Sequence, residues 1–434
     1  MGSDNPDITS LASPEPSLET GRLATMFRSL RHRDFALFWG GNFLSNIGTW
    51  MQNLALGWLI LLMTNSPFLL GLNGFLGSAP SLFFSLPGGA IADRLNRRKL
   101  MIYTQSALMI LALALAVFTG FHVIKLGEIL LISLLAGLAS ALNNPAYQAM
   151  VPDLVEREDL VNAIALNSAQ FNMSRAIGPT VAGLALGALG AAGCFFLNSL
   201  SFLPLIIALL VITVPPHPGA GEEGPTVWAA MLEGLRFVWK HRFLVILLSI
   251  PSSLSLFALP FVVLMPVIAR DMLKVGASGL GFLMAGAGLG AVIAALTLAA
   301  QGDVEHKGKY ILLSASTFSL ALILLSLAHS FWWGFCLLVV CGGTMVGALA
   351  LTNTTLQMVS PPELRGRIMS MYNLAVLGLA PLGSLQAGTV AEALGARLAL
   401  ALGGGICLVY CLILLTFLPR LGRETTLPAA GVRG

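Results

Sequence analysis

The chain has 434 residues, of which 56% are hydrophobic and only 10% are charged, and its mean hydropathy is +0.84. Soluble domains carry about 25% charged residues. A large soluble globule is therefore excluded, because it would expose apolar patches beyond what soluble monomers tolerate. The formal net charge of +4 is too small to indicate a nucleic-acid partner.

The first 33 residues are polar and rich in Ser and Pro, without a short apolar region followed by a cleavage site. We therefore expect no cleaved signal peptide. The five cysteines lie inside apolar runs and lack the spacing of a zinc or redox motif. We predict no metal site and no cofactor.

A membrane-spanning helix needs about 20 mostly apolar residues. Runs of this length, broken at Pro, Gly and charge clusters, predict twelve spans, at 36–62, 68–90, 100–121, 127–148, 161–187, 190–214, 243–269, 277–300, 309–329, 331–356, 367–391 and 396–418. The sequence thus predicts an all-α integral membrane protein with twelve transmembrane helices in two pseudo-symmetric six-helix bundles.

The longest interruption lies between the sixth and seventh spans. Its Pro/Gly/Glu part is typical of a flexible linker, and Val227, Met231, Leu235 and Val238 follow at helical spacing, which predicts an amphipathic interfacial helix. The expected organisation is a polar tail (1–33), a first bundle (34–214), a linker (215–242), a second bundle (243–419) and a tail (420–434).

Basic residues are distributed unequally between the two sets of loops. Cytoplasmic loops of membrane proteins are enriched in Lys and Arg. One side has Arg157 and the basic residues near 28–33, 94–99, 236–242, 307–309, 365–367 and 420–423, whereas the other has Lys125, Arg270, Lys274 and Arg397. We expect both termini to be cytoplasmic and the protein to be a multi-pass component of a bacterial-type inner membrane.

The two halves also resemble each other, as expected of secondary transporters that bind substrate between repeats. The matching pairs, 209 or 210 positions apart, are Gly71 with Gly281, Asp93 with Asp303, Asn144 with Asn353 and Gln148 with Gln357.

The loop after the second span reads "LPGGAIADRLNRRKL" and contains Gly89, Asp93, Arg94, Arg97 and Arg98. It resembles the signature of the major facilitator superfamily, and the resemblance extends over roughly 34–419. Asn96 replaces the signature's second glycine. Because Asn tolerates a left-handed backbone, we expect the turn to be kept.

The resemblance implies alternating access between the two bundles, with this loop as a cytoplasmic latch. In family terms, Asp93 lies across the bundle interface near Ile368, and Arg97 reaches Asp153. Arg97, Arg98 and Lys99 are expected to contact anionic lipid headgroups.

The segment "AIGPTVAGL" resembles an element associated with exporters, through Gly178, Pro179 and Gly183, although Ala182 replaces a glycine. It predicts a thin, Pro-kinked helix face that packs closely on a neighbour. Ordinary Gly and Pro usage is the alternative. The segments "FWGGNFLSN" and "NNPAYQAMV" are similar to the enterobactin-exporter-like subgroup, which includes siderophore and drug exporters.

Polar residues inside membrane spans are candidates for a substrate pathway. The set comprises Asn42, Asn46, Gln52 and Asn53 on one face of 36–62, then Asn144, Tyr147 and Gln148, and their counterparts Asn353 and Gln357. Hydrogen bonding between helices is the alternative for the first group, and gate contacts between the halves for the others.

Arg175 is the one base deep inside a predicted span. A buried arginine needs a partner, so we expect it either to bind an anionic group of the substrate or to bond backbone carbonyls, Asn or Gln.

These patterns predict a transporter rather than an enzyme. The expected activity is secondary export of a small siderophore-like or drug-like molecule, coupled to protons as the family suggests, although no acid lies in the middle of a span. The expected partners are the substrate, membrane lipids and a coupling proton, and the protein is expected to act as a monomer. An uptake carrier and a receptor or scaffold on the same fold are the alternatives.

Overall fold

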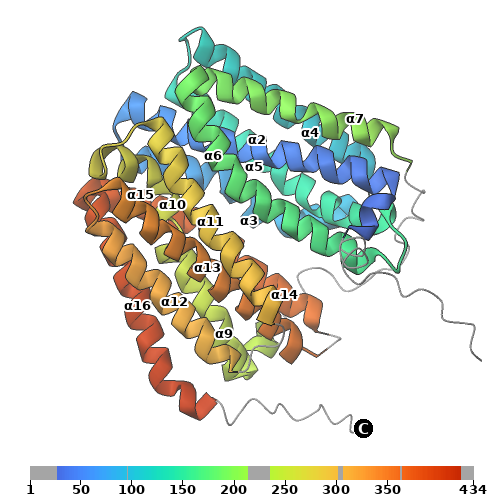
Figure 1. The fold of residues 1–434 in the computed structure, drawn as a ribbon. Helices are drawn as coiled ribbons and strands as arrows, with labels where there is room; N and C mark the ends of the chain where they lie inside the picture. The colour runs from blue at the N-terminus through green and yellow to red at the C-terminus, as the bar shows by residue number, and fades with distance from the viewer. Residues whose placement is uncertain (1–26, 95, 214–234, 302–305, 362–363, 422–434) are drawn as a thin grey trace, which may run out of the picture.

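The computed structural model describes residues 27–94, 96–213, 235–301, 306–361 and 364–421, and every regular element in these ranges is helical (Figure 1). The elements of the first half are η1 (Arg28–Arg31), α2 (Arg33–Thr64), α3 (Pro67–Arg94), α4 (Arg97–Gly120), α5 (Leu126–Met150), η2 (Val151–Leu154), α6 (Leu160–Ser201) and α7 (Leu203–Val211). Those of the second half are α9 (Arg242–Ser253), η3 (Leu254–Ala258), α10 (Phe261–Val267), η4 (Ile268–Met272), α11 (Ala277–Gln301), α12 (Lys307–Ser326), α13 (Phe331–Val359), α14 (Arg365–Asn373), η5 (Leu374–Gly378), α15 (Ala380–Leu394) and α16 (Ala396–Leu421).

Ten helical segments in the described ranges are long and apolar enough to cross a membrane. One of them, Leu160–Val211, has 52 residues, about twice the length of one crossing. Its backbone leaves the helical conformation at Gly190, where φ is +70°. This break lies where the fifth and sixth predicted spans were separated. If Leu160–Val211 counts as two crossings, the ten segments contain eleven. The helix α3, which has 28 residues and is not among the ten, brings the count to the predicted twelve.

Local sequence explains how the first two spans are joined. Asn65 ends α2 with φ of +51°, a left-handed conformation that Asn adopts more readily than other non-glycine residues. Pro67 then occupies the first position of α3, where its missing N–H is not needed by the helix. The result is a tight hairpin at the end of the molecule opposite η1, which we call the distal end (Figure 1).

The helices form two bundles that meet through a small number of pairs. Within the first half α2 packs on α6 and α3 on α5, while within the second half α11 packs on α13 and α12 on α16. Between the halves, the main contacts are those of α3 with α15 and of α6 with α11 (Figure 1). The all-helical, two-bundle architecture predicted from the sequence is therefore confirmed.

Each of the two main contacts between the halves includes a point where two glycines meet. A Cβ added to Gly183 would lie 2.5 Å from the Cα of Gly281, and one added to Gly71 would lie 2.8 Å from the Cα of Gly388. Such separations are too short for any side chain, so the backbones themselves are in contact. Gly71 and Gly281 are the pair matched by the internal repeat, so the two crossings are related by the same pseudo-symmetry.

Candidate functional site

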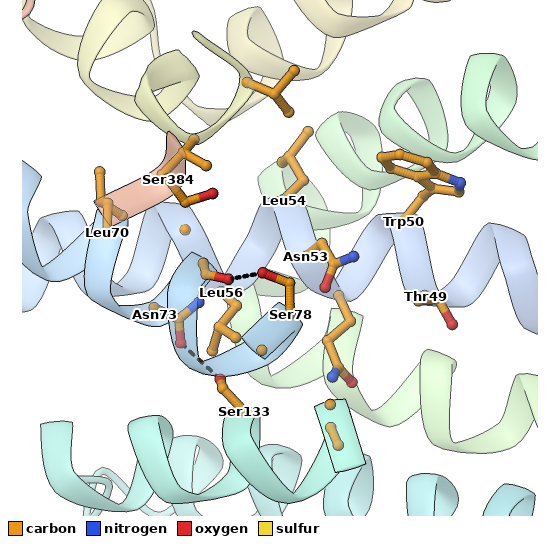
Figure 2. Close-up of a pocket in the computed structure, with 18 of the residues that line it drawn as sticks. Thr49, Trp50, Asn53, Leu54, Leu56, Leu70, Asn73, Ser78, Ser133 and Ser384 are labelled. Atoms are coloured by element: carbon orange, nitrogen blue, oxygen red, sulfur yellow. Dashed lines mark hydrogen bonds between the residues drawn. The ribbon is translucent and has the colours of Figure 1, made fainter. Parts of the chain in front are cut away.

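A cavity of about 480 Å³ lies between the two bundles, next to the glycine crossings (Figure 2). Its wall combines residues of α2, α3, α4, α5 and α6 with residues of α10, α11 and α15. This volume falls within the range of pockets for small organic molecules. The polar side chains of the wall are Thr49, Gln52, Asn53, Asn73, Ser78, Ser133, Ser140, Asn198 and Ser384.

At the distal end, two charged side chains of the second half form hydrogen bonds with the ends of α2 and α3. Arg270, from η4, donates to the carbonyl oxygen of Leu61 at 3.2 Å and to Oδ1 of Asn65 at 2.7 Å, so it caps the C-terminus of α2. Glu392, from α15, accepts from Ser66 Oγ at 2.8 Å and from the N–H of Phe68 at 3.1 Å, at the N-terminus of α3. Each charge has the sign that the helix dipole favours at that position.

Of the residues predicted for the substrate pathway, Gln52 lies in the cavity wall, where its Oε1 accepts from Asn198 Nδ2 at 2.7 Å. Asn53, on the same predicted face, is an exposed part of the wall and forms no hydrogen bond within the described ranges. Asn46 is partly buried and is not part of that wall.

Asn42 and Tyr147 belong to a network inside the first half. Asn42 Nδ2 donates to the Tyr147 hydroxyl and to Gln170 Oε1, both at 3.0 Å, and the Tyr147 hydroxyl donates to Asn167 Oδ1 at 3.0 Å. These bonds join α2, α5 and α6. Their geometry favours the alternative of hydrogen bonding between helices over direct contact with a substrate.

The repeated polar pairs of α5 and α13 lie outside the cavity wall. Asn144 and Gln148 are exposed on α5, while on α13 Gln357 donates to Asn353 Oδ1 at 2.7 Å. Within the described part of the chain, no hydrogen bond joins Asn144 or Gln148 to α13. Their predicted role as a gate or a ligand contact stays a prediction.

Arg175 is partly buried on α6, one helical turn before Pro179, which does line the cavity. Its Nη2 atom is buried and has no hydrogen-bond partner among the described residues. Within the described part of the chain, the structure shows none of the contacts to backbone carbonyls, Asn or Gln that were one of its two expected roles. A buried guanidinium with an unsatisfied donor is costly, which makes the residue a candidate for binding an anion.

The element containing Gly178, Pro179 and Gly183 does form a thin helix face. A Cβ added to Gly178 would lie 2.5 Å from Cβ of Trp50, and Gly183 meets Gly281 as described above. The predicted close packing is therefore present. The main break of α6 is not at the proline, however, because the backbone remains helical through Pro179 and departs from helical geometry at Gly190.

At the start of α4, Arg97 Nη1 lies 3.2 Å from Asp153 Oδ2, which confirms the expected ion pair, and 3.3 Å from the Ala149 carbonyl. Arg98 donates to the carbonyls of Leu209 and, at 2.7 Å, of Leu210. Both guanidinium groups thus bond within the protein, rather than only the lipid headgroups that the sequence had suggested.

For the rest of the loop after α3, the structure corrects the expected turn at Asn96 and does not describe the side chains of the preceding residues. Asn96 does not form a left-handed turn: its φ is −64°, and its side chain accepts from the N–H of Lys99 at 3.1 Å as the N-cap of α4. The structure does not describe the side chains of 84–94, which include Gly89, Asp93 and Arg94, so the expected approach of Asp93 to Ile368 stays a prediction. Asp303 and most of the predicted linker, 214–234, also lie outside the described residues.

Several wall residues were not singled out from the sequence. Ser133 Oγ donates to Asn73 Oδ1 at 2.7 Å across α3 and α5 (Figure 2), and Asn198 and Ser384 complete the polar set. The rule that polar groups inside apolar spans are functional candidates applies to Asn73 and Asn198, and would have found both.

Comparison with known proteins supplies the family. Residues 24–430 match the family described as transmembrane secretion effector. The chain is 26% identical to the staphyloferrin A transporter of Staphylococcus aureus over 367 residues, which cover 82% of this chain and 89% of that protein. It is 28% identical to the enterobactin exporter EntS of Shigella boydii over 361 residues, which cover 82% and 86%.

Solved structures show the same fold at low sequence identity. A bacterial homologue of the human lysosomal transporter Spinster, in an inward-facing and unoccupied conformation, superposes with a TM-score of 0.69 at 14% identity, covering 93% of this chain and 99% of that one. The nucleoside transporter NupG gives a TM-score of 0.67 at 13% identity, covering 89% and 99%.

Proposed function

The chain belongs to the transmembrane secretion effector family of the major facilitator superfamily, and from this membership we propose that it exports a small organic molecule by alternating access. The observation that carries the proposal is the cavity between the two bundles, which is lined by both halves and lies next to backbone contacts at the distal end. Binding at the interface of two repeats is the arrangement expected of secondary transporters.

The direction of transport is argued from the charge distribution and from the relatives. With both termini in the cytoplasm, as the basic loops favour, the distal end faces outward. The glycine crossings then close the outer side, so that the cavity loads from the cytoplasm. A relative named as an enterobactin exporter, 28% identical over most of both chains, supports export of a siderophore-like or drug-like substrate.

The proposal also includes the membrane, the oligomeric state and the driving force. We place the protein in a bacterial inner membrane, as its bacterial relatives and basic loops suggest. We propose a functional monomer, because both halves of one chain line the cavity. The driving force we propose is a proton gradient. The acids of the described helices lie at the helix ends, as Glu128, Asp271 and Glu392 do, so the described residues supply no acid in the middle of the membrane as a proton carrier.

The test is a strain that lacks the protein, complemented with the wild-type gene or with an empty vector. The proposal expects the deletion strain to retain more of a panel of drugs and to secrete less siderophore, and a protonophore to abolish the difference. A deletion strain that accumulates less of a substrate than the complemented strain would instead identify an uptake carrier. A strain that differs in neither direction would favour a receptor or scaffold.

A further inference from the structure

The two walls of the cavity differ in chemistry. The first half contributes eight of the nine polar side chains given above, whereas the second half contributes Val262, Val263, Met265, Pro266, Leu280, Met284, Ala380 and Ser384. The hydroxyl of Ser384 donates to the carbonyl of Ala380 in its own helix at 2.9 Å. A bound molecule therefore meets almost all of its hydrogen-bonding groups on the first half, where they lie among apolar residues such as Leu54 and Phe202, and an almost wholly apolar surface on the second half.

Much of the polar wall is already engaged. Gln52 bonds Asn198, Asn73 bonds Ser133, and Ser78 donates to the carbonyl of Gly74 at 2.6 Å. Asn53 and Ser140 form no hydrogen bond within the described residues, and of the two only Asn53 carries an amide, deep inside a membrane span. Figure 2 shows its side chain extending from α2 between Ser78 and Trp50. An amide in this position has both a donor and an acceptor free for a ligand.

No side chain among the described residues of the wall carries a charge. A cation that enters the cavity would lose its hydration without gaining a carboxylate, which is strongly unfavourable. The ring of Trp50 offers a cation–π contact, but such a contact is weak compared with the hydration that is lost. Arg175, one turn from the cavity on α6, adds a positive charge that also repels cations.

We infer that the cavity selects an amphipathic molecule without positive charge, held with its hydrogen-bonding edge on Asn53 of α2 and its apolar face on α10 and α11. Asn53 is then a specificity-determining residue. The inference rests on the proposed function, in that it takes the cavity to be the place where the transported molecule binds. It goes further by excluding cationic amphiphiles as ligands.

The test uses two fluorescent probes made from the same aminocoumarin carboxylic acid. One is its uncharged ethyl ester and the other is its cationic choline ester. Binding to the full chain in lipid nanodiscs is followed by the change in fluorescence. The ethyl ester should bind, and the choline ester should bind at least tenfold more weakly. Equal or tighter binding of the choline ester would overturn the inference, and so would failure of both probes to bind.

Two substitutions then test Asn53 itself. Asn53→Leu should weaken binding of the ethyl ester about threefold to tenfold, the effect of one hydrogen bond, while Asn53→Asp should make the choline ester the tighter ligand. The matched control is Asn172→Leu, because the Asn172 amide donates to Ser168 of its own helix at 2.8 Å and is not part of the wall.

All three variants are checked for an unchanged unfolding temperature in the nanodisc. A folded Asn53→Leu variant that binds the ethyl ester as the wild type does would overturn the role of Asn53. Because these measurements need no transport, a protein that shows the expected selectivity but exports nothing would contradict the proposed function and leave the inference standing.

Discussion

The two ends of the molecule use charged side chains in different ways. At the end that carries η1, the ion pairs Arg97–Asp153 and Arg28–Asp159 each lie within the first half. At the distal end, Arg270 and Glu392 of the second half bond the ends of α2 and α3 in the first half. A charge that bonds across the halves must release its partner when they separate there, whereas a pair inside one half moves with it.

This difference implies that charged contacts at one end stabilise a bundle, whereas those at the other end change during the transport cycle. The pairs within the first half stabilise that bundle throughout the transport cycle, and the contacts at the distal end belong to one state of that cycle. Substitutions at the two ends should therefore separate effects on stability from effects on transport.

The largest effect is expected at the glycine crossings. Gly183→Ala places a Cβ 2.5 Å from the Cα of Gly281, and overpacking of this kind costs about 1–3 kcal/mol. Transport should fall to background because the distal end cannot close. Transport in proteoliposomes and thermal unfolding measure the two effects. Gly405→Ala is the control, since a Cβ at Gly405 meets nothing within 4 Å. Equal behaviour of the two variants would refute the role of the crossing.

Arg175 is a charge that belongs to neither end. If it binds an anionic group, Arg175→Gln should lower transport of an aminocoumarin carboxylate at least tenfold in proteoliposomes and change that of its ethyl ester less than twofold. The unfolding temperature should not fall, because the variant removes a buried donor without a partner. Arg397→Gln is the control. It removes the same kind of side chain, but one whose guanidinium already donates to the carbonyls of Ser326 and Ala328. Wild-type carboxylate transport by Arg175→Gln would contradict this role.

Asp93 tests whether the end that carries η1 also has a contact across the halves. If Asp93 forms a latch with the start of α14, as the family resemblance implies, Asp93→Asn should slow transport several-fold. It should leave membrane insertion and the amount of folded protein unchanged. Initial transport rates at matched protein amounts measure the effect. Wild-type rates would show that no latch of this kind limits the cycle.

A smaller effect is expected from the charges at the distal end. Glu392 is exposed, and a charge at a helix terminus contributes about 0.3–1 kcal/mol. Glu392→Gln should therefore raise opening toward the outside by a few-fold at most. The readout is the rate at which an impermeant maleimide, added from outside, labels a cysteine introduced at Ser140 in the cavity wall. Glu128→Gln is the control, because Glu128 accepts from the backbone of Lys125 within the first half. Unchanged labelling in Glu392→Gln would show that this contact does not hold the end closed.

The sequence predicted the spans better than the site for a physical reason. Span limits follow from the length of apolar runs and from breakers, and Gly190 lies at the predicted break between two spans. Which face of a helix looks into the cavity depends on how the halves pack. The polar stripe of α2 therefore included both Gln52, in the wall, and Asn42, in an internal network. Ser133, unlike Asn73, is recognised only through the contact between α3 and α5.

The smallest effect is expected for the ion pair inside the first half. The side chains of Arg97 and Asp153 are 20% and 11% exposed, and exposed pairs contribute up to about 1 kcal/mol. Partial burial places this pair near the top of that range. Asp153→Asn should therefore lower the unfolding temperature slightly in nanodiscs, while transport per folded molecule stays at the wild-type level. If Asp153→Asn instead slowed transport as much as Asp93→Asn without lowering stability, the pair would belong to the switching contacts. The contrast between the two ends would then fail, because charges within one half would also change during the cycle.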